Sequence, residues 1–148
     1  MNLDFHGRVA IVTGAGGGLG RQHALALAAR GAKVLVNDLG GARDGSGSSL
    51  SAAEAVVAEI RAAGGEALAN GASVTDFEAV QAMVKQAVDA WGRVDILVNN
   101  AGILRDKSFA KMELADFRLV VDVHLMGAVH CCKACLLYTS DAADERSS

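Results

Sequence analysis

A glycine-rich segment between an apolar run and a helical segment constrains the fold of this chain more than any other feature. The segment is Thr13 to Gly20 (TGAGGGLG), and it follows residues 8–13 (RVAIVT), which have the pattern of a buried strand. Residues 18–30 are rich in alanine and leucine and predict a helix. A side chain would block the turn, an approaching ligand or helix–strand packing at three positions, Gly14, Gly18 and Gly20. The segment therefore predicts a helix N-terminus that faces an anionic group such as a pyrophosphate, and a plain glycine-rich turn is the alternative.

The strand–helix alternation continues along the chain. Further strands are expected at 33–37, 66–70 and 94–98, and helices at 51–63, from Asp76 through Trp91, and at 113–135; residues 39–48 are expected to form a loop. This order predicts an α/β fold, a Rossmann-type doubly wound parallel sheet with helices on both faces. Right-handed crossovers would place the carboxyl ends of the first and fourth strands side by side, where ligands bind in such folds.

Asp38 follows the second strand, 18 residues beyond Gly20, which is close to the position of an acidic residue that binds an adenosine ribose. Its carboxylate can accept hydrogen bonds from both ribose hydroxyls and would repel a 2′-phosphate, which favours NAD over NADP. A solvated loop aspartate is the alternative. Arg21 and Arg43 could also cradle a phosphate.

The fourth strand is followed by Asn99-Asn100-Ala101-Gly102. Small residues there would keep the backbone near a cofactor, and the amides can join this loop to neighbouring strands, although an ordinary Asn/Gly turn has the same composition. The three motifs all lie at predicted carboxyl ends of strands. Together they predict one crevice for a nicotinamide dinucleotide.

Composition narrows the class of protein. The chain has 148 residues, a net charge of -3 and 51% hydrophobic residues, which indicates a folded domain and gives no reason to expect nucleic acid or an anionic membrane as a partner. We expect no membrane-spanning run and no signal peptide. The cysteines are clustered at Cys131, Cys132 and Cys135, which favours reduced thiols and a cytoplasmic location.

The glycine motif and Asn99-Asn100-Ala101-Gly102 resemble those of the short-chain dehydrogenase/reductase family. The stretches NDLGGARDGSG and NNAGILRDKSFAKM are similar to the 3-hydroxyacyl-CoA dehydrogenases of that family, over about residues 3 to 135. The resemblance implies NAD-linked oxidation of a 3-hydroxyacyl-CoA and, for a full-length parent, a homodimer. The cofactor contacts that motifs and resemblance predict are Gly14, Gly18, Leu19, Gly20, Asp38, Ser73, Val74, Asn99, Ala101 and Gly102.

The chain departs from the family pattern in its last part. The family uses a serine and a Tyr-x-x-x-Lys motif, but Tyr138 precedes any fifth strand and the residue four later is Ala142, so we reject it as the catalytic tyrosine. His124 occupies the place of the asparagine in the family's active-site tetrad, and a helix histidine that packs on its neighbours is the alternative. Residues 136–148 fit neither the family nor the preceding helix and resemble a translated sequencing adapter. We therefore expect a domain truncated after the fourth strand and the following helix, a foreign tail, and no turnover by this chain.

Two other readings of the sequence stay open. His130, Cys131, Cys132 and Cys135 have the residue types of a metal or redox site, but the segment is predicted to be a helix and no second ligand pair has suitable spacing, which favours packed cysteines. We therefore predict no metal site. A dinucleotide-binding module without chemistry is the other reading.

Overall fold

The fold is a parallel sheet with helices on both faces, as expected from the sequence. A computed structural model describes residues 3–40 and 50–147, with side chains through residue 139. Residues 41–49, which hold Arg43 and most of the predicted 39–48 loop, lie outside the described residues. The strands in the described part are β1 (Val9–Val12), β2 (Lys33–Asn37), β3 (Ala67–Asn70) and β4 (Ile96–Val98). All neighbours are parallel, and the order is β3-β2-β1-β4, which places the first and fourth strands side by side as predicted.

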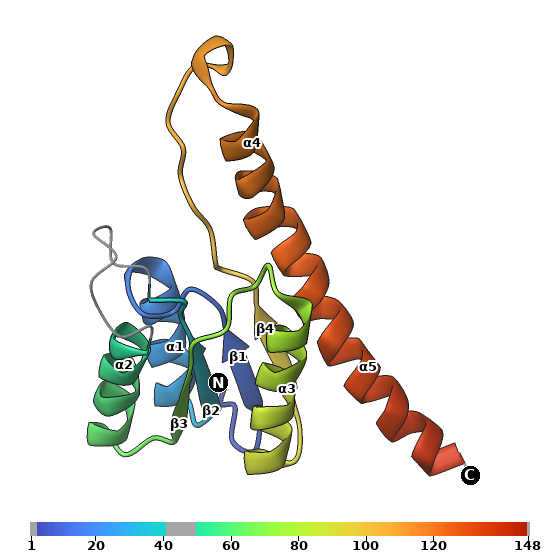
Figure 1. Cartoon of the computed structure of the whole chain (residues 1–148). Helices are drawn as coiled ribbons and strands as arrows, with labels where there is room; N and C mark the ends of the chain where they lie inside the picture. The colour runs from blue at the N-terminus through green and yellow to red at the C-terminus, as the bar shows by residue number, and fades with distance from the viewer. Residues whose placement is uncertain (1–2, 41–49, 148) are drawn as a thin grey trace.

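The helices cover the sheet in two pairs. α1 (Gly18–Ala29) and α2 (Ser51–Ala62) lie on one face, and α3 (Phe77–Trp91) and α5 (Gly127–Ser147) lie on the other, as Figure 1 shows. Alternation along the strands supplies both cores, because successive side chains point to opposite faces. Ala10, Val12, Val34 and Val36 pack towards α1 and α2, whereas Val9, Ile11 and Leu35 pack towards α3 and α5.

Local signals in the sequence explain where several helices begin and end. The Asp76 carboxylate accepts a hydrogen bond from the Ala79 N–H at 3.2 Å and caps α3, as expected. Gly92 ends the same helix with φ +80°, and Gly31 follows α1 with φ +100°, a backbone conformation that side chains disfavour.

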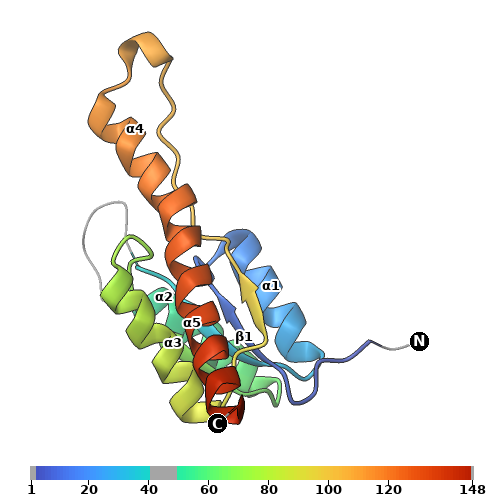
Figure 2. The same ribbon diagram turned by 90° about the vertical axis from the view of Figure 1, so that its right-hand side faces the viewer.

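The segment after β4 extends beyond the sheet and then returns along it (Figure 2). It contains a 3₁₀ turn (Phe109–Lys111), α4 (Leu114–Val121), a π-helical turn (Asp122–Met126) and α5. The sequence predicted one helix at 113–135, but α5 continues to Ser147, so residues 136–147 extend the preceding helix instead of leaving it.

This helical stretch also corrects the expectation about membrane spans. The helix from Leu114 to Thr139 is long and apolar enough to cross a membrane by length and composition alone, with a mean hydropathy of 1.5 over its best stretch. Asp122 and Lys133 interrupt the apolar run, which is why the sequence did not indicate it. Packing accounts for part of the apolarity, because Cys131 and Ala134 of α5 are buried against α3 and the sheet, but only 17% of the stretch is buried.

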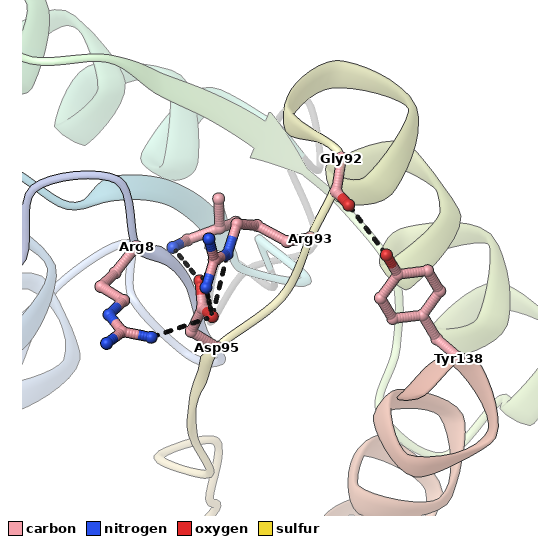
Figure 3. A network of polar contacts seen from close by, with 6 residues as sticks. Arg8, Gly92, Arg93, Asp95 and Tyr138 are labelled. Carbon is pink, nitrogen blue, oxygen red and sulfur yellow. Dashed lines mark hydrogen bonds and ion pairs between the residues drawn. The ribbon is translucent and has the colours of Figure 1, made fainter. Parts of the chain in front are cut away.

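A cluster of charged side chains joins the amino ends of β1 and β4 (Figure 3). The Asp95 carboxylate accepts hydrogen bonds from the Val9 N–H at 2.8 Å and from the Arg93 guanidinium at 2.6–3.0 Å, and Arg8 lies 3.6 Å away. Burial raises the pKa of Asp95, but these hydrogen bonds and the two positive charges outweigh it and hold the pKa below its usual range. The ionised carboxylate thereby fixes β4 beside β1.

Candidate functional site

The glycine-rich turn between β1 and α1 is shaped by close backbone approaches. Gly14 has φ +61°, and a Cβ there would lie 2.9 Å from the Ala101 Cα. A Cβ on Gly20 would collide with the Gly14 carbonyl oxygen and the Asn100 amide. Gly18 has φ +55° and, like Gly17, would place a Cβ in open space. The turn is therefore closely packed on its inner side and open on its outer side, where α1 begins.

Asp38 is held beside this turn by backbone donors. Its Oδ2 accepts a hydrogen bond from the Gly16 N–H at 2.9 Å, and its Oδ1 accepts one from the Gly40 N–H at 2.8 Å. A Cβ on Gly16 would lie 2.7 Å from the same Oδ2, so the carboxylate can approach the turn only because residue 16 is a glycine. The side chain is half-buried, and among the described residues each carboxylate oxygen accepts one hydrogen bond, which leaves lone pairs for further donors.

Thr13 and Asn100 join the turn to the segment after β4. The Thr13 hydroxyl accepts hydrogen bonds from the N–H groups of Asn100 at 3.1 Å and Ala101 at 3.0 Å. The Asn100 side-chain amide donates to the carbonyl oxygens of Thr13 at 3.1 Å and Gly14 at 3.0 Å. An amide of the Asn-Asn pair thus connects neighbouring strands, as the sequence led us to expect.

A cavity of about 330 Å³ opens at the carboxyl ends of the strands. It brings together six of the predicted site residues: Gly14, Asp38, Ser73, Val74, Ala101 and Gly102. It is also lined by residues that the sequence did not single out as contacts: Asn37, Leu39, Ala72, Asn100, Ile103 and Val123. Segments far apart in the sequence therefore form one crevice.

Four predicted residues do not line this cavity. Gly18 and Leu19 lie at the exposed start of α1, where Leu19 is 72% exposed, and Gly20 is buried in the packing of the turn. The exposed Asn99 directs its amide to the Cys132 sulfur at 3.5 Å. Their roles as cofactor contacts stay predictions.

Buried amides support the wall of the cavity next to Asp38. Asn37 is 2% exposed, and its amide donates to Asn70 Oδ1 at 2.9 Å and to the Ala72 carbonyl at 3.0 Å. Asn70 in turn donates to Gln86 of α3 at 2.9 Å. The sequence could have indicated Asn37, because it is a polar residue at the end of an apolar strand. A polar side chain that is buried there must have hydrogen-bond partners.

His124 lies in the π-helical turn and contacts the other wall. Its Nε2 is 3.0 Å from the Ile103 nitrogen and 2.9 Å from the Ile103 oxygen. An unprotonated Nε2 accepts a hydrogen bond from the Ile103 N–H, and a protonated Nε2 donates one to the Ile103 carbonyl, so either tautomer binds this backbone. A Cβ on Gly102 would lie 2.6 Å from the His124 ring. His124 therefore positions the segment after β4, at a helical irregularity of a kind that is frequent at functional sites.

The cysteines and Tyr138 lie away from the cavity lining. Burial raises the pKa of Cys131 to about 12 and that of Cys135 to about 11, with smaller contributions from neighbouring thiols. Among the side chains described, those of residues 3–40 and 50–139, no group of three His, Cys, Asp or Glu could hold a metal ion. The Tyr138 hydroxyl donates to the Gly92 carbonyl at 2.8 Å (Figure 3), beside the end of α3 that precedes β4.

Comparisons with known proteins agree with this architecture. The family profile described as short chain dehydrogenase matches residues 8–144. The chain is 57% identical over 136 residues to a peroxisomal multifunctional enzyme type 2 of Drosophila melanogaster, covering 92% of this chain and 22% of that protein. A crystal structure of a short chain dehydrogenase from Mycobacterium avium superposes with a TM-score of 0.88 and 46% identity, covering 98% of this chain and 51% of the other. A 7α-hydroxysteroid dehydrogenase in complex with NADH gives a TM-score of 0.80 at 36% identity, covering 90% of this chain and 49% of the other. The chain spans about half or less of each of these proteins, and it belongs to the short-chain dehydrogenase family.

Proposed function

We propose that this chain is the NAD-binding part of a dehydrogenase that oxidises 3-hydroxyacyl-CoA. The single observation that carries the proposal is the cavity in which the glycine-rich turn, Asp38 and the segment after β4 meet. Its residues fit a dinucleotide: the turn is open at Gly17 and Gly18, where a pyrophosphate needs space, and the Asp38 carboxylate lies beside it. Bound NAD would supply the hydride acceptor for oxidation of an alcohol.

Charges near the turn favour NAD over NADP. The Asp38 carboxylate can accept hydrogen bonds from ribose hydroxyls and repels a 2′-phosphate. Arg21, the described arginine nearest in sequence to the turn, donates from Nε to Glu59 Oε1 at 3.0 Å and from Nη2 to Glu59 Oε2 at 2.5 Å. This bidentate pair holds the guanidinium of Arg21 against Glu59 of α2, and therefore away from the 2′-phosphate of NADP.

The substrate and the homodimer are proposed from the relationship to the multifunctional enzyme, the compartment from the cysteines and the domain boundary from the sequence after Cys135. We propose a 3-hydroxyacyl-CoA substrate, a homodimer for a full-length parent, a reducing compartment such as the cytoplasm, and a domain boundary near Cys135. The Drosophila melanogaster relative is named as peroxisomal, which makes that compartment the alternative.

A non-catalytic dinucleotide-binding module is the second candidate for the chain as given. Tyr138, the one tyrosine of the sequence, donates its hydroxyl to Gly92 at the far end of the sheet from the cavity. In this reading the 148-residue chain binds NADH but forms none from NAD and a 3-hydroxyacyl-CoA. Formation of NADH in that assay would overturn the expected inactivity.

Titration of the purified chain with NADH and NADPH, followed by cofactor fluorescence, tests the cofactor proposal. We expect NADH to bind more tightly than NADPH, and Asp38→Asn to weaken NADH binding by about tenfold or more, because a charged hydrogen bond is lost. Asp106→Asn, at an exposed loop position, is the matched control and should leave both affinities unchanged. Binding of NADPH as tightly as NADH by the unsubstituted chain would refute the role of Asp38, and binding of neither would refute the site.

A further inference from the structure

One wall of the cavity is a short loop, Ala72 to Val74, between β3 and α3. Its amino end is fixed to the sheet, because the Ala72 N–H donates to Asn70 Oδ1 at 2.9 Å and the Ala72 carbonyl accepts from Asn37 at 3.0 Å. Its carboxyl end leads into α3, where the Ser73 carbonyl accepts from the Asp76 N–H at 3.1 Å. Between these anchors the loop is held by a helix from a distant part of the chain.

That helix is α5, and His130 makes the polar contact. His130 Nδ1 lies 2.7 Å from the Val74 carbonyl oxygen. A carbonyl only accepts, so Nδ1 carries the proton and donates it to this bond. The ring also packs against Phe77 of α3, with ring centroids 5.5 Å apart and a tilt of 43°. The half-buried imidazole is therefore held in one orientation by two elements.

The same helix approaches the Val74 side chain closely. A Cβ on Gly127, one turn before His130, would lie 2.6 Å from Val74 Cγ2. Val74 is only 7% exposed and belongs to the core formed with α3 and α5. The backbone of α5 therefore packs on the Val74 side chain while His130 binds the Val74 carbonyl, and a shift of either would move the cavity wall.

We propose that His130 is a positioning residue for the adenosine half of the cofactor, acting through the backbone of Val74. The inference rests on the proposed function, since a wall formed by Ser73 and Val74 next to Asp38 is where the adenosine would bind. The imidazole makes no contact with the ligand itself. Its hydrogen bond keeps the loop at the spacing from Asp38 that the adenosine requires.

Substitutions that move the donor atom test this mechanism. In His130→Asn the side-chain amide can occupy the place of Nδ1, whereas in His130→Gln the amide lies one bond further out and cannot reach the Val74 carbonyl in the same geometry. His130→Ala removes the donor altogether. His23→Ala, at an exposed histidine of α1, is the matched control.

The readout is the affinity for NADH and for ADP-ribose, which lacks the nicotinamide, together with thermal unfolding of each variant. We expect His130→Ala and His130→Gln to weaken both ligands by about threefold to tenfold, the range that one neutral hydrogen bond supports. His130→Asn should restore binding to within about twofold of the unsubstituted chain, and His23→Ala should change nothing. Rescue by asparagine separates positioning from a general loss of packing, which all three substitutions would cause.

Three outcomes would overturn the inference. His130→Ala that binds both ligands as tightly as the unsubstituted chain would refute it, and so would equal binding by the asparagine and glutamine variants, even if the alanine variant does not fold. In both cases the cofactor site itself would stand. If the unsubstituted chain binds neither ligand, the proposed function fails and the inference fails with it.

Discussion

Thr13→Val tests how the site is built, because it removes a hydroxyl and keeps the shape of the side chain. Thr13 is 1% exposed, and its Oγ1 accepts hydrogen bonds from the N–H groups of Asn100 and Ala101 at 3.1 and 3.0 Å. A valine methyl group in the same place accepts neither. The substitution therefore leaves the Ala101 N–H without a partner next to the buried end of β1. The Asn100 N–H still donates to the Val98 carbonyl at 3.0 Å.

The expected cost follows mainly from this one donor. A buried donor that loses its partner costs about 1–3 kcal/mol, so the free energy of unfolding should fall by about 1–3 kcal/mol. The whole free energy of unfolding of a domain is roughly 5–15 kcal/mol, so this loss is a large fraction of the stability. Affinity for NADH should fall as well, because Asn100 and Ala101 line the cavity.

Urea unfolding followed by circular dichroism measures this loss. With a slope of about 2 kcal/mol per molar urea, the midpoint should fall by about 0.5–1.5 M in Thr13→Val. Thr13→Ser keeps the hydroxyl and controls for the change of methyl group; its midpoint should lie much closer to that of the unsubstituted chain. A valine variant that unfolds within about 0.2 M of the unsubstituted chain would show that these hydrogen bonds do not hold the two segments together.

Two further predictions concern packing and burial. Gly20→Ala should lower the free energy of unfolding, measured in urea, by about 2 kcal/mol or more, because its Cβ would collide with the Gly14 carbonyl. In the control Gly17→Ala the Cβ meets nothing within 4 Å, so its stability should stay within about 0.5 kcal/mol of the unsubstituted chain. Equal stabilities of the two variants would contradict the close packing of the turn. Burial raises the pKa of Cys131 from about 9 to about 12, so the folded chain keeps a proton that the unfolded chain loses between these pH values. Stability from this thiol is complete below pH 9 and should fall by about 2 kcal/mol at pH 10.5. Cys135, whose pKa burial raises to about 11, adds a fall of its own over the same range, so chemical denaturation should detect a fall that is smaller by about 2 kcal/mol in Cys131→Ala than in the unsubstituted chain.

The sequence predicted the elements and their order because each carried a local signal. Apolar runs marked the strands, and Asp76 marked the start of α3. The fourth strand was expected at 94–98 but begins at Ile96, because Asp95 directs its side chain to the Val9 N–H and the arginines. A charged residue before a strand gives no indication of which strand it will bind.

The residue types of the site were predicted from the sequence, but the directions in which their side chains point were not. Asn99 and Asn100 are the same residue type in the same motif, yet only Asn100 turns its amide towards the glycine-rich turn, while Asn99 faces Cys132. Which of two adjacent side chains points inward depends on the register of β4 with β1, which a sequence pattern alone does not specify. His130 was considered only as a metal or redox ligand, because its partner, Val74, is 56 residues away.

The cavity therefore depends both on the carboxyl ends of the strands and on the helical stretch that follows β4. The strand ends supply its base, since parallel strands in the order β3-β2-β1-β4 bring the glycine-rich turn, Asp38 and Asn100 to one edge. Its two walls are held by one helical stretch, through the contact of His124 with Ile103 and of His130 with Val74. Because these histidines lie on opposite sides of the junction between the π-helical turn and α5, a change in how that stretch packs would move both walls together. The geometry of the site is therefore set as much by the packing of α5 on α3 as by the motifs that predicted it.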